Sequence, residues 1–135
     1  MLQMPKMIRP EVLLFSFRPE ERTMRMIRYL TAQGVSVRTV QANELGESLG
    51  FLFSLPGYDK RNTSVMTPQK IPEMLVMHGF DQAMLDEFLR FFRMENIRRV
   101  ELKAILTPTN AAWTAAELSR HLTAERDAIQ KRNRA

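Results

Sequence analysis

The sequence contains no cysteine. Without thiols the chain can form no disulfide, no cysteine-ligated zinc or iron–sulfur site and no thiol nucleophile. It has no run near the ~18 apolar residues that a membrane-spanning helix needs. Its first residues, MLQMPKMIRPEVLLF, are interrupted by prolines and charges where a signal peptide would be apolar. These absences predict a cytoplasmic protein that does not enter the membrane.

Several catalytic and cofactor signatures are also missing. The chain has no Walker loop, no dinucleotide-binding fingerprint and no G-x-S-x-G elbow. Its two histidines, His78 and His121, belong to no known metal-binding motif, so no metal site is predicted. We therefore expect no cofactor and name no catalytic residue, and the sequence favours a binding protein over an enzyme.

The composition is that of an ordinary globular protein, and it predicts a single domain over residues 1–135. Hydrophobic residues make up 44% of the chain, which is enough for a core. The net charge of +5 is uneven, because residues 1–41 carry seven Lys or Arg against three acids and residues 119–135 carry five against two. Such a basic excess permits nucleic-acid binding without requiring it.

Two stretches of the chain resemble each other. EVLLFSFRPEERTMRMIRYLTAQGVSVRTV and EMLVMHGFDQAMLDEFLRFFRMENIRRVEL both read strand, helix, strand. We interpret residues of about 11–41 and 73–106 as a duplicated β-α-β unit.

The apolar patterns predict an α+β fold. Residues 12–15 and 74–77 are continuous apolar runs, which are typical of central strands buried on both faces. Residues 35–40 are mixed and residues 99–106 alternate, which predicts edge strands. The expected architecture is a ferredoxin-like two-layer sandwich with sheet order 4-1-3-2, followed by a C-terminal helix at about 114–130. The alternative is a three-layer parallel α/β fold.

The helix starts are marked by capping residues. Pro19 is predicted at the first position of the first helix, whose buried stripe would carry Met24, Ile27 and Leu30. Asp81 is predicted to cap the second helix.

The long connection of residues 42–72 has more than one interpretation. Its apolar part, LGESLGFLFSLPGY, either covers one end of the core or forms a flap or partner surface. In a two-layer fold the open face of the sheet also needs a cover. That cover would be this segment with the C-terminal helix, or a second subunit of a symmetric dimer.

The stretch LTPTNAAWTAAEL, residues 106–118, holds the only tryptophan. Thr114 and Glu117 have the spacing of a capping box, and Trp113 and Leu118 that of a hydrophobic staple. Folding therefore explains the second half of the stretch.

The first half leaves a surplus of polar side chains. Thr107, Thr109 and Asn110 lie just ahead of a helix start, where an anion or carboxylate can bind. Lys103 and His78 are the nearest further candidates for such a site. Turn formation is the competing explanation, because Asn and Thr commonly stabilise turns.

A stripe of arginines follows the first helix: Arg18, Arg22, Arg25 and Arg28. Their spacing places them on one helix face. The sheet offers only Phe15 and Phe17 as stacking platforms, so a solvated helix face is favoured over a nucleic-acid interface.

The segment LKAILTPTNAAWTAAEL, residues 102–118, resembles the signature of a bacterial family known only as a domain of unknown function, and the resemblance extends over about residues 74–122. It implies domain boundaries and no activity. The predicted function is a non-catalytic binding or regulatory module for a small ligand or a protein partner. The alternatives are nucleic-acid binding and an enzyme with an anion-binding TPTN turn.

Overall fold

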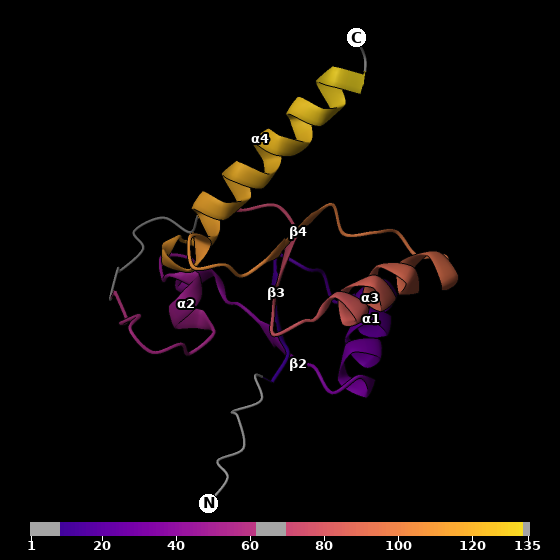
Figure 1. Ribbon diagram of the computed structural model, residues 1–135, viewed down its shortest axis with the longest axis horizontal. Helices are drawn as coiled ribbons and strands as arrows, with labels where there is room; N and C mark the ends of the chain where they lie inside the picture. Colours follow the sequence, from indigo (N-terminus) through magenta and orange to yellow (C-terminus); the bar gives the residue numbers. More distant parts are fainter. Residues whose placement is uncertain (1–8, 62–69, 134–135) are drawn as a thin grey trace, which may run out of the picture.

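The computed structural model describes residues 9–61 and 70–133 and shows an α+β protein built on a mixed sheet (Figure 1). The strands are β1 (Glu11–Phe15), β2 (Ser36–Thr39), β3 (Met74–His78) and β4 (Leu102–Ile105). The helices are α1 (Glu21–Ala32), α2 (Leu49–Leu52), α3 (Gln82–Met94) and α4 (Ala115–Asn133), with short 3-10 turns at Ala42–Glu44 and Asn110–Ala112. The described part of the chain therefore matches the predicted class.

The sheet order is β2-β1-β3-β4, with β1 parallel to β2, β3 parallel to β4, and the central strands antiparallel. The central position of the two apolar strands is confirmed. The predicted order 4-1-3-2 is wrong, because each edge strand pairs with the strand that precedes it across a helix. A ferredoxin-like sheet requires a short connection that places the second strand beside the third. Here residues 40–73 separate β2 from β3, so nothing forces them together.

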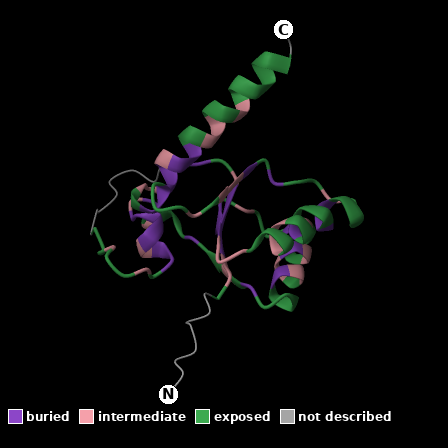
Figure 2. Ribbon diagram, in the orientation of Figure 1, coloured by how far each residue is buried: buried purple, intermediate pink, exposed green. Residues whose placement is uncertain are grey.

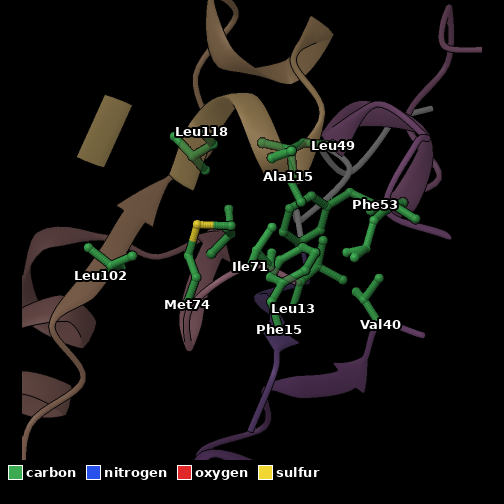
Figure 3. Close-up of a cluster of buried hydrophobic side chains, with 14 residues drawn as sticks. Leu13, Phe15, Val40, Leu49, Phe53, Ile71, Met74, Leu102, Ala115 and Leu118 are labelled. Carbon is green, nitrogen blue, oxygen red and sulfur yellow. The ribbon is translucent and has the colours of Figure 1, made fainter. Parts of the chain in front are cut away.

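Helices cover both faces of the sheet. Along β1, Val12 and Leu14 pack on one side, and Leu13 and Phe15 pack on the other. The first side is covered by α1 and α3, and the second by α2 and the start of α4 (Figures 1 and 3). The two-layer prediction is wrong in this respect. The parallel alternative is wrong as well, because β1 and β3 run antiparallel.

The connection between β2 and β3 provides the cover for the second side. Ser48 caps α2 by accepting the Phe51 N–H at 3.1 Å, and Leu49 and Phe53 are buried in the core beneath it. Tyr58 then packs directly on Gly50, where even a Cβ atom would meet its ring at 2.5 Å. The expected covering role of this segment is confirmed, and residues 62–69 of the connection lie outside the described residues.

The helix boundaries follow capping chemistry, with one exception. Asp81 accepts the Met84 N–H at 2.8 Å, so its predicted role as N-cap of α3 is confirmed. Helix α1 begins at Glu21 with Glu20 as its N-cap, so the prediction that Pro19 is its first residue is wrong. Its buried residues are Thr23, Met26 and Leu30, whereas Met24 is half exposed, which corrects the predicted stripe.

Helix α4 begins in the core and ends in solvent. Thr114 Oγ1 accepts the Glu117 N–H at 3.2 Å, and Glu117 accepts the Thr114 N–H at 3.3 Å, which confirms the capping box. Ala115 and Leu118 are buried, but most residues from Ala124 onward are exposed, and the helix projects from the body (Figure 2). No helix within residues 9–61 and 70–133 is both long and apolar enough to span a bilayer.

Candidate functional site

The residues Thr107 to Asn110 form a closed turn after β4. Asn110 is buried; its Oδ1 accepts the Thr107 N–H at 2.8 Å, and its Nδ2 donates to the Ile105 carbonyl at 3.1 Å. Thr107 Oγ1 in turn accepts the Asn110 N–H at 3.1 Å. The two backbone N–H groups that could hold an anion are therefore already bonded to side chains of the turn.

The same turn closes part of the free edge of β4. The Leu106 N–H donates to the Met77 carbonyl, so the backbone groups of Leu106 point toward β3. By strand alternation those of Ile105 point outward, where the Asn110 side chain binds the Ile105 carbonyl. Edge strands that carry capped carbonyls or lysines resist pairing with other chains. This edge closure gives Asn110 a structural role.

Thr109 is the one exposed polar side chain of the predicted trio that makes no hydrogen bond to another described residue. It extends from the turn into solvent. A single hydroxyl of this kind provides little chemistry by itself.

Lys103 is partly buried and is the second residue of β4, two residues before the end of the strand that leads into the turn. Its Nζ donates to the Val100 carbonyl. Burial lowers the pKa of Lys103 from its usual value, the nearby Arg99 charge lowers it further, and Glu101 opposes the shift. The amine is therefore directed back toward its own strand entrance and away from the TPTN turn.

His78 is the last residue of β3. Because β3 and β4 are parallel, His78 lies at the same end of the strands as the turn. Its ring lies against Phe53 of the covering segment, with a centroid distance of 5.3 Å. Thr107 follows the end of β4, so the fold brings His78 and Thr107 into one region. No hydrogen bond of the His78 ring to Thr107 or Lys103 exists among the described residues.

The arginine stripe is divided between structural and free side chains. The Arg22 side chain is only 11% exposed; it binds both Glu73 oxygens, at 3.0 and 2.9 Å, and the carbonyls of Arg98 and Arg99. Arg25 pairs with Glu95 at 2.9 Å. Arg18 and Arg28 remain exposed, so the predicted continuous basic face is reduced to two separate side chains.

The helix N-termini beside the strand ends carry acids. Proteins with parallel strand pairs often bind phosphate where a strand leads into a helix N-terminus. Here the Asp81 carboxylate accepts the Met84 N–H in the first turn of α3, and Glu20 and Glu21 lie at the N-terminus of α1. These carboxylates repel an anion at both positions. Among residues 9–61 and 70–133, no group of three or more His, Asp or Glu side chains could hold a metal ion.

Two hollows lie away from every predicted site residue. One, of about 600 Å³, separates α4 from Lys70–Pro72. The other, of about 230 Å³, lies between α1 and α3 and is lined by aromatic and aliphatic side chains. Sequence reasoning missed both, because each is formed by elements whose distance in space no local pattern encodes.

The described residues thus define an α+β protein with a mixed sheet covered on both faces. The family model of a domain of unknown function, DUF3783, matches residues 73–129, from the start of β3 to near the end of α4. This similarity agrees with the expected resemblance to an uncharacterised family and assigns no activity. No curated protein and no solved structure matches the chain.

Proposed function

We propose that this chain is a non-catalytic binding module that works as a symmetric dimer, with α4 as the interface. The observation that carries the proposal is the projecting helix. In proteins most of the stability of a helix comes from tertiary packing of one of its faces. Most of the last ten described residues of α4 lack such packing within one copy. A partner would supply it.

One face of α4 has the composition of a close helix–helix contact. Ser119, Thr123 and Ala124 are small side chains that line the 600 Å³ hollow. Small residues let two helix axes approach to about 8 Å. In the proposed dimer the end of a second α4 lies in this hollow, between α4 and Lys70–Pro72.

The charges on this face suit a second copy of the chain. Arg120 and Asp127 lie seven residues, about two turns, apart on the face that lines the hollow. In an antiparallel pair related by a two-fold axis between Thr123 and Ala124, each Arg120 lies opposite the partner's Asp127. Isologous contacts of this kind repeat every interaction twice. Among the described residues of one copy, Asp127 pairs with Arg126 at 3.5 Å, and the Asp127 side chain is 63% exposed.

Sedimentation equilibrium of the full chain tests the dimer. Arg120→Glu places like charges opposite each other and should weaken association about ten-fold, since each of two exposed pairs contributes up to about 1 kcal/mol. Asp127→Arg should do the same. The double variant Arg120→Glu with Asp127→Arg restores opposite charges and should recover the wild-type dimer.

The matched control is Arg28→Glu, which changes the net charge equally but lies on exposed α1 in the other layer. It should leave the association constant unchanged. A wild-type chain that stays monomeric at all concentrations contradicts the proposal, as does a double variant that associates no better than the single ones.

Origin and location belong to the same proposal. We propose a cytoplasmic bacterial protein that forms one domain from two related β-α-β units. The resemblance of residues 102–118 to a bacterial signature supports the origin, and the shared order of β1-α1-β2 and β3-α3-β4 supports the duplication. The anion-binding alternative has less support, because the amides of Thr107 and Asn110 are engaged. Nucleic-acid binding has less support because Arg22 and Arg25 are paired with carboxylates.

A further inference from the structure

The smaller hollow, between α1 and α3, has a defined chemical character. Tyr29 and Phe88 lie nearly parallel, with ring centroids 6.0 Å apart, and Phe80 meets Phe88 at 6.2 Å in a tilted arrangement. Phe88 is 1% exposed and forms the floor. Tyr29 also stacks on Phe91, at 4.4 Å. The hollow is lined by three aromatic rings, whose π systems carry a quadrupole that attracts cations.

The polar groups of this hollow are few and of one sign. Among its lining residues only Glu87 carries a formal charge, and Gln33 and the Tyr29 hydroxyl are its other side-chain polar groups. Glu87 has a neighbouring cation, Arg90, but at 4.0 Å, with both side chains more than half exposed. A pair that is so exposed and so long contributes little, which leaves the carboxylate free to bind a ligand.

The Glu87 carboxylate and the Tyr29 hydroxyl belong to residues that line the same hollow. Burial raises the pKa of Tyr29 above its usual value, and the charge of Glu87 raises it further. Tyr29 therefore stays a neutral hydrogen-bonding group at physiological pH, and Glu87 is close enough to be felt at its hydroxyl.

We propose that this hollow binds a small organic cation: a primary amine carried on a compact aromatic or branched apolar body. The apolar body would lie among Tyr29, Phe80 and Phe88, and the ammonium would face Glu87 at the rim. Aromatic faces together with a carboxylate are the groups that recognise such cations. The volume of about 230 Å³ is below the roughly 300 Å³ at which drug-sized sites begin, which limits the ligand to a small molecule. This site lies in the layer opposite α4, so it is independent of the proposed dimer.

Phenethylammonium is the probe, and 2-phenylethanol and phenylacetate are its neutral and anionic counterparts. Titration of the full chain by ¹H–¹⁵N NMR should move the amide signals of residues 29–35 and 80–88. The amine should bind about three- to five-fold more tightly than the alcohol, which corresponds to a cation–π and charge contribution at an exposed rim. Phenylacetate should bind more weakly than either.

Two variants separate charge from shape. Glu87→Gln keeps the size of the side chain and should reduce amine binding to the level of the alcohol, while leaving alcohol binding unchanged. Glu125→Gln, an exposed glutamate on α4, is the matched control and should change neither. Ala83→Leu fills the hollow and should weaken all three ligands.

Equal affinities of wild type for the amine and the alcohol would overturn the proposal. So would an amine preference that survives Glu87→Gln, or signal changes confined to other parts of the chain. None of these results bears on dimer formation through α4, which the Arg120 and Asp127 variants test separately.

Discussion

At the scale of single residues, Asn110 organises the end of β4. It is buried, and it makes three hydrogen bonds with Thr107 and Ile105 through its side chain and backbone. Asn110→Ala leaves the Thr107 N–H and the Ile105 carbonyl without these partners, so we expect a loss of about 2–3 kcal/mol in the free energy of unfolding. Urea denaturation measures this loss.

Thr109→Ala, in the same turn but exposed, should change the free energy of unfolding by less than about 0.5 kcal/mol. Equal losses in the two variants would show that the side-chain bonds of Asn110 contribute nothing specific.

The lowered pKa of Lys103 predicts that the stability of the fold depends on pH. Burial and the Arg99 charge hold its folded-state pKa below the usual 10.5. The unfolded chain therefore binds more protons than the folded chain in the interval between the lowered pKa and 10.5. Stability from this group must rise as pH increases through that interval.

The comparison with Lys103→Met isolates this effect, because methionine has a similar stem and no charge. The variant should be more stable than wild type near pH 7, and the difference should shrink as pH approaches 10.5. Urea unfolding at a series of pH values measures both curves. A constant difference across this range would mean that Lys103 titrates alike in the folded and unfolded chain.

At the scale of elements, local chemistry predicted more than pairing did. The Thr114–Glu117 capping box and the Asp81 cap were predictable because a cap is decided within four residues of the chain. The burial of β1 and β3 was predictable from continuous apolar runs. The partners of the edge strands were not, because pairing depends on the path of the connection between β2 and β3. The candidate site was predictable as a set of polar residues, but the mutual bonding of Thr107 and Asn110 appears only in three dimensions.

At the scale of the whole molecule, Arg22 makes contacts between the two β-α-β units, β1-α1-β2 and β3-α3-β4. It lies on α1 of the first unit, and its guanidinium binds Glu73 just before β3 and the carbonyls of Arg98 and Arg99 just before β4. The same group sits 5.9 Å from the centre of the Phe17 ring. One side chain thus joins three segments whose separation in sequence gave no sign of contact.

Because the planar Arg22 guanidinium donates to both Glu73 oxygens and to two carbonyls, its contribution to stability depends on its shape as well as on its charge. Arg22→Ala should lower the free energy of unfolding by about 2–3 kcal/mol, because it leaves Glu73 and two carbonyls without their donor. Arg22→Lys should recover less than half of that loss, since an ammonium cannot reproduce the bidentate pair and the two carbonyl bonds at once. A double-mutant cycle with Glu73→Gln should give a coupling of about 1–2 kcal/mol.

Arg25→Ala, whose Glu95 partner is half exposed, is the matched control and should lose less than about 1 kcal/mol. If Lys at position 22 restored wild-type stability, the joint between the units would depend on charge alone, and the carbonyl bonds of Arg98 and Arg99 would carry no part of it.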